Sequence, residues 1–172
     1  MASNQIQLPA LSKGWSVAEK IIAVILAAGS VFVLYSEVSL IAQTIRSGYL
    51  ESTQQSYMKL IQMHHLPVLV SVLGLFGGCM MLFNDKTGWI LSLIATAMFG
   101  FLFFVSSRSN AANSTFAFSS FYKSYGVTSL TCFLLFILLL VAPLRKKYKP
   151  TSKNWMWIVG LILILVLDKL FL

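Results

Sequence analysis

The sequence predicts an all-α integral membrane protein, a bundle of about five transmembrane helices with four as the alternative count. Hydrophobic residues make up 58% of the 172 residues and charged residues only 10%, well below the quarter typical of a soluble domain. The apolar residues are also gathered in runs near the 20 residues that a bilayer requires. We expect one transmembrane domain over 1–172, with the lipid bilayer as its main surroundings.

The first predicted span covers 17–45. Ser16 and Glu19 stand at the spacing of a capping box, which predicts a helix start with Ser16 at the N-cap. An apolar run then extends from Ile21 to Ala42, interrupted by one ionisable residue, Glu37. Because this run is longer than the core of a signal peptide, we expect an uncleaved span that tilts or protrudes.

Small and polar residues in this span recur as pairs seven positions apart. At about 100° per residue, seven residues return to nearly the same direction, so the pairs form one polar stripe. Lipid cannot satisfy polar groups, and the stripe must therefore face protein or water. Its polar members are the candidate lining of a hydrated path: Ser30, Ser36, Glu37, Gln43 and Thr44.

The second and third spans are predicted over 65–83 and 88–105, joined by a tight turn. The second carries a GxxxG pattern, and the third carries a small residue every four positions. Small residues let another helix backbone approach closely, so we expect the two spans to pack as an antiparallel hairpin. The packing residues are Gly74, Gly78, Gly88, Ser92, Thr96 and Gly100.

The fourth and fifth spans are predicted over 127–144 and 155–172, with Pro143 ending the fourth. In the four-span alternative, the last run lies flat on the membrane. A short loop between the two runs carries Arg145, Lys146, Lys147, Lys149 and Lys153. The positive-inside rule places this loop and the N-terminus inside. Nucleic acid is not expected as a partner of the +8 chain, since no basic domain carries this charge.

Glu37 is the carboxylate placed well inside a predicted span, so it must be neutral, paired or hydrated. It is either a proton or cation site or a structural hydrogen bond between helices. His64 and His65 begin the second span, where one of them could reach Glu37. Adjacent helical residues diverge by about 100°, so we expect no metal site from this pair. Asp168 is expected to be solvated at the chain end.

No enzyme signature stands out, and we expect neither catalysis nor a cofactor. The leading functional hypothesis is a homo-oligomeric pore, channel or membrane-permeabilising effector in the plasma or inner membrane. The polar stripe would line its path, with Glu37 as a ring that attracts cations. The alternative is an accessory or assembly subunit that docks the same stripe onto a larger membrane complex.

Overall fold

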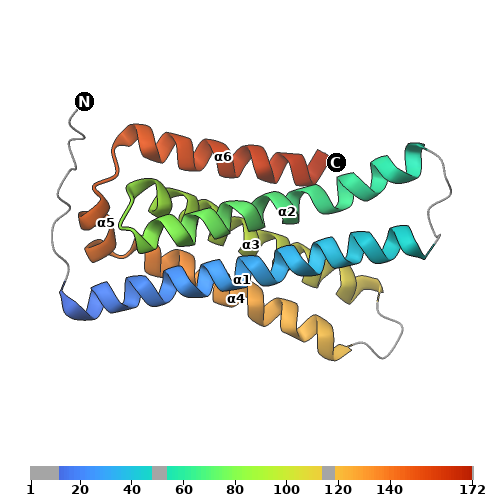
Figure 1. Cartoon of the computed structure of the whole chain (residues 1–172), viewed down its shortest axis with the longest axis horizontal. Helices are drawn as coiled ribbons and strands as arrows, with labels where there is room; N and C mark the ends of the chain where they lie inside the picture. Colours follow the sequence, from blue (N-terminus) through green and yellow to red (C-terminus); the bar gives the residue numbers. More distant parts are fainter. Residues whose placement is uncertain (1–11, 48–53, 114–118, 172) are drawn as a thin grey trace.

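The computed structural model describes residues 12–47, 54–113 and 119–171, which contain helices and no strand (Figure 1). The predicted all-α class is confirmed. In chain order, the helices are α1 (Lys13–Arg46), α2 (Gln54–Leu82), α3 (Lys86–Asn113), α4 (Ser119–Leu140), α5 (Ala142–Tyr148) and α6 (Ser152–Phe171).

Four helices of the described part are long and apolar enough to cross a membrane: α1, α2, α3 and α6. A fifth span results if the Gly126–Leu140 part of α4 and α5 are taken as one bent element, with an angle of 58° between them. The count of four or five agrees with the sequence prediction, and the architecture is compatible with a membrane protein.

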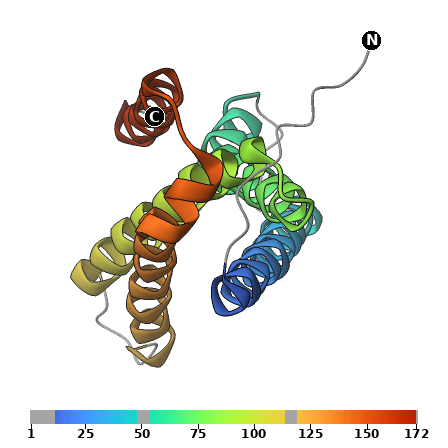
Figure 2. The same ribbon diagram turned by 90° about the vertical axis from the view of Figure 1, so that its left-hand side faces the viewer.

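α3 forms the centre of the bundle. Each of the first four helices packs against its neighbour in the chain, and α6 packs mainly against α3. Figure 2 shows α6 standing apart from α1 and α4. The buried core follows α3, where the side chains of Trp89, Leu93 and Met98 have no exposed surface.

Glycines of α2 allow α1 and α3 to approach it from two sides. A side-chain carbon at Gly78 would lie 2.7 Å from the carbonyl oxygen of Ala23 in α1. One at Gly77 would lie 2.8 Å from the backbone nitrogen of Ser92 in α3. Real side-chain carbons do not come so close to backbone atoms. The lack of a side chain at Gly77 and Gly78 therefore lets α1 and α3 pack directly against the α2 backbone.

The small-residue faces serve more neighbours than the predicted α2–α3 hairpin. Gly78 faces α1, and Gly100 faces the ring of Phe133 in α4 at 3.0 Å. The hairpin is closed by Gly77 against Ser92 and by Gly88 against Met80 and Met81. Assigning Gly78 and Gly100 to the hairpin was wrong, because spacing marks a face but does not say which helix covers it.

The other two packing residues lie close to the same contacts. Gly74 faces the Ser30 hydroxyl of α1 and the Phe99 ring of α3, so it serves both neighbours. Thr96 is fully buried, and its hydroxyl donates to the carbonyl of Ser92 one turn earlier, at 2.8 Å.

The predicted capping box is wrong. α1 begins at Lys13 with Ser12 in the cap position, so Ser16 lies inside the helix. Glu19 is only 2% exposed and faces the interior rather than the helix start. A capping box needs its serine at the N-cap, but the N-cap is Ser12, and Glu19 binds Lys147 instead.

The fourth predicted span is broken rather than ended by proline. α4 stops at Leu140, and α5 turns away from it by 58°. Pro143 lies in the first turn of α5, where its missing N–H leaves no helical hydrogen bond unmade. Arg145, Lys146 and Lys147 are therefore helical, whereas they were predicted in a loop.

Candidate functional site

Two carboxylate–histidine pairs connect three helices in the half of the bundle remote from α5. His64 Nδ1 of α2 lies 2.5 Å from Glu37 Oε2 of α1. His65 Nε2 lies 2.7 Å from Asp168 Oδ2 of α6. Adjacent residues of a helix point about 100° apart, which explains why His64 reaches α1 while His65 reaches α6. We refer to these four residues as the two carboxylate–histidine pairs.

Of the two pairs, Glu37–His64 is the more shielded, and we call it the inner pair. Asp168–His65 is the outer pair. The side chains of Glu37 and His64 are 17% and 18% exposed, against 30% and 33% for Asp168 and His65. A shielded ion pair or hydrogen bond is weakened less by water and salt than an exposed one. The Glu37–His64 contact is therefore the firmer link between helices, and the Asp168–His65 contact is the more accessible one.

His65 makes two contacts that fix its ring between α2 and α6. Its Nδ1 lies 2.9 Å from the Gln62 carbonyl oxygen, and its Nε2 faces Asp168. A carbonyl oxygen can only accept, so Nδ1 donates. One bond thus orients the ring on its own helix, and the other joins α2 to α6.

The polar stripe of α1 divides into two rows. Ser30 is buried against Gly74, Glu37 is bound to His64, and the Thr44 hydroxyl donates to the Leu40 carbonyl at 2.9 Å. These three positions form the inner row.

The outer row consists of Gly29, Ser36 and Gln43. Ser36 is half-buried, whereas Gly29 and Gln43 are exposed. A side-chain carbon built at Gly29 would meet no other described atom within 4 Å, apart from its own helix. Within one copy of the chain, the Glu37 carboxylate is thus taken by a histidine, and an open face remains beside it.

A second ionic cluster ties together the opposite half of the bundle. Lys147 Nζ of α5 donates to both carboxylate oxygens of Glu19 at 2.7 Å and to Asn84 Oδ1 at 2.6 Å. The Tyr148 hydroxyl also hydrogen-bonds Glu19. The three lysine donors are therefore all used. Lys147, predicted in a basic loop, is instead buried with its side chain 8% exposed.

The remaining residues of the predicted basic loop stay at the surface. Arg145, Lys146, Lys149 and Lys153 are all exposed. α5 carries the first two, Lys149 follows its end, and Lys153 lies in the first turn of α6.

Sequence reasoning missed the partners that lie far apart in the chain. Asp168 was predicted to be solvated, but it is bound by a residue 103 positions away. Glu19 and Lys147 are 128 positions apart. The available signal was weak: each carboxylate adjoins a long apolar run, where an unpaired charge is costly, but nothing in the local pattern names the partner.

No protein-family model matches the chain, and neither curated proteins nor solved structures gave a match. Among the described residues, no group of three or more His, Cys, Asp or Glu side chains could hold a metal ion. What the two carboxylate–histidine pairs can do is hold three helices together.

Proposed function

We propose that the protein is a multi-pass membrane protein of the plasma or inner membrane that acts as an accessory or assembly subunit of a larger membrane complex. One observation carries this proposal: the outer row of the α1 stripe is left open by the described helices of the same chain. The partner surface would be a transmembrane helix of another protein, packed along Gly29, Ser36 and Gln43.

The open row has the features of a helix-packing face. Gly29 offers room for a foreign backbone, and small residues mark interfaces between membrane helices. Phe32 and Tyr35 beside it are 72% and 73% exposed and provide apolar contact area. The glycines of α2 contrast with it, because Gly74, Gly77 and Gly78 are all covered within the chain. The polar side chains of Ser36 and Gln43 can form hydrogen bonds with a protein neighbour, whereas lipid tails offer none.

A homo-oligomeric pore is the second candidate. It is favoured by the same row, because copies of the chain could cover Gly29 and turn Ser36 and Gln43 toward a shared path. Glu37 supports it less, since its carboxylate contacts His64 and would have to leave that partner to form a charged ring. The accessory subunit needs no such rearrangement, and for this reason we prefer it.

Site-specific photocrosslinking in cells tests both candidates. A photoreactive amino acid at Gln43 on the open row is compared with one at Ile164, which is 61% exposed on α6. We expect an adduct from position 43 only, containing a different membrane protein identified by mass spectrometry. The adduct should be lost with Gly29→Leu and kept with Gly160→Leu, since both glycines have open surroundings among the described residues.

The mass and composition of the adduct separate the candidates. An adduct that contains two copies of the 19.1 kDa chain would contradict the accessory-subunit proposal and favour the homo-oligomer. Ion conductance in a planar bilayer would then test the pore. If positions 43 and 164 give the same adducts, or none but lipid, the open row is not an interface and both candidates fail.

A further inference from the structure

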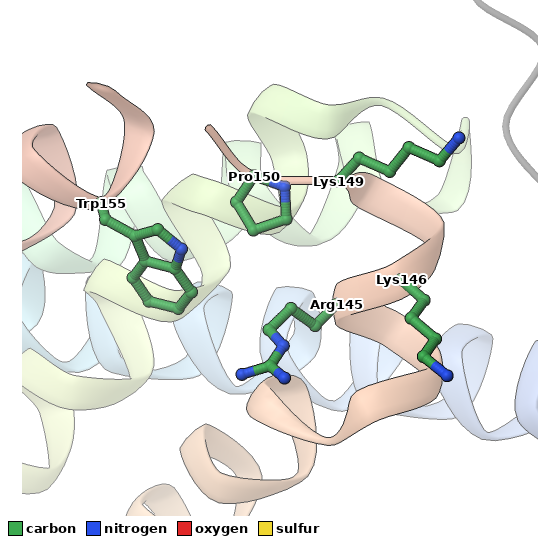
Figure 3. A pocket seen from close by; sticks show the side chains of 5 residues that line it. All are labelled: Arg145, Lys146, Lys149, Pro150 and Trp155. Atoms are coloured by element: carbon green, nitrogen blue, oxygen red, sulfur yellow. The ribbon is translucent and has the colours of Figure 1, made fainter. Parts of the chain in front are cut away.

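A basic hollow of about 580 Å³ lies between α5 and the start of α6. Its lining residues are Arg145, Lys146, Lys149, Pro150 and Trp155. In Figure 3, Arg145 extends from α5 and Trp155 from α6 on the same side, with Pro150 between the two helices and the lysines reaching away over α5. The Arg145 guanidinium and the Trp155 ring thus lie on the same side, Lys146 and Lys149 complete the lining with their side chains extending away, and no acidic residue belongs to it.

The shape of this hollow is fixed by local structure. Lys149 has a left-handed conformation, with φ of 42°, that ends α5 and turns the chain toward α6. Lys86 of α3 donates to the Lys149 carbonyl at 3.0 Å and holds this turn in place. The Trp155 ring meets the buried Trp89 ring edge-on at 6.0 Å. Both walls are therefore anchored to α3.

The electrostatic surroundings favour an anion. Among the described residues at this end of the bundle, the acidic ones are Glu19 and Asp85. Lys147 binds Glu19, and Asp85 accepts a hydrogen bond from the backbone N–H of Thr87. Further cations lie at the same end, at Lys13, Lys20, Lys86 and Lys153. Neither carboxylate belongs to the lining of the hollow.

We propose that this hollow binds the phosphate group of an anionic phospholipid. The proposal rests on the membrane location proposed above. A guanidinium such as Arg145 donates two parallel hydrogen bonds to a phosphate, and tryptophan is favoured at the depth of lipid headgroups. Basic hollows between membrane helices at the cytoplasmic side are typical sites of acidic headgroups.

The apolar surface that adjoins the hollow favours a lipid over a free anion. Met156 and Val159 lie within about 100° of Trp155 around α6 and are 75% and 61% exposed. Acyl chains attached to the bound headgroup can lie along these side chains. A soluble phosphate would use the cations alone and gain nothing from this surface.

The test measures how many phosphatidylglycerol molecules stay bound to the purified full chain in neutral detergent, by native mass spectrometry. Phosphatidylcholine is the neutral comparison lipid, and inorganic phosphate is the free anion, followed by its effect on melting temperature. The Arg145→Gln/Lys146→Gln pair removes two cations from the hollow. The control pair, Lys20→Gln/Lys153→Gln, removes two exposed cations from the same end outside it.

We expect the parent to retain phosphatidylglycerol in preference to phosphatidylcholine. The hollow pair should lower its apparent affinity about tenfold or more, the size of one lost hydrogen bond to a charged group, while the control pair stays within about twofold. Equal losses in both pairs would mean diffuse attraction to the basic end and overturn the site. Equal stabilisation by inorganic phosphate would identify a free-anion site and overturn the lipid.

The membrane location is checked separately by alkaline extraction of cell membranes. If the chain is extracted as a peripheral protein, both the proposed function and the lipid site fail. If it is retained but the parent shows no lipid preference, only the lipid site fails, and the accessory-subunit proposal still stands on its crosslinking test.

Discussion

Lys147 Nζ lies 2.7 Å from each carboxylate oxygen of Glu19, joining α5 to α1 across 128 positions of the chain. Both side chains are almost fully buried. If one partner is removed, the other charge stays buried without compensation. A single substitution therefore lowers stability by more than the intact pair contributes to it. The 58° bend between α4 and α5 brings Lys147 to Glu19.

Lys147→Met should lower the free energy of unfolding by about 3 kcal/mol, because Glu19 is left buried without its cation. Lys146→Met is the matched control on the exposed side of α5 and should stay within about 0.5 kcal/mol of the parent. Denaturation in a neutral detergent measures both. Similar losses for the two variants would show that the cluster does not stabilise the bundle.

The outer carboxylate–histidine pair predicts that His65 helps to hold α6 against the bundle. Its Nε2 lies 2.7 Å from Asp168 Oδ2, whereas α6 otherwise packs mainly against α3. His65→Gln should therefore loosen α6, because the contact between α2 and Asp168 is lost.

Hydrogen exchange of α6 amides at a fixed pH measures this link. Exchange should be faster in His65→Gln than in the parent. His64→Gln is the control, since His64 contacts α1 rather than α6. Equal α6 protection in the parent and in His65→Gln would show that this contact does not hold α6.

Glycines with opposite surroundings predict opposite effects of the same substitution. Gly78→Leu must displace the backbone of α1 at Ala23, and overpacking of this kind costs about 1–3 kcal/mol. Gly160→Leu meets open space among the described residues and should not lower stability. Thermal unfolding in detergent compares them. If Gly78→Leu melts like Gly160→Leu, the close α1–α2 contact is wrong.

Composition and run lengths were enough to predict the helical class and the four or five helices that are long and apolar enough to cross a membrane, because the bilayer thickness constrains apolar runs directly. The sequence also indicated that a histidine could reach Glu37, because the two lie toward the same end of their predicted spans, and His64 does so. It could not assign His65 to Asp168 or Lys147 to Glu19. Those contacts depend on the bend after Leu140 and on where α6 packs, which no local pattern encodes.

The last prediction concerns the orientation in the membrane. The basic end of the bundle contains α5, and the positive-inside rule places it in the cytoplasm with the N-terminus. A cysteine at position 146 tests this better than one at 147, because Lys146 is exposed whereas Lys147 is buried and would escape labelling on either side.

The labelling uses a background in which Cys79 and Cys132 are replaced by alanine. In intact cells, a membrane-impermeant thiol reagent should leave position 146 unlabelled and label a cysteine at position 47, at the exposed end of α1. Both should react once the membrane is opened, which shows that each site is accessible. Labelling of position 146 but not 47 in intact cells would reverse the orientation and place the basic end, with its lipid site, on the outer face.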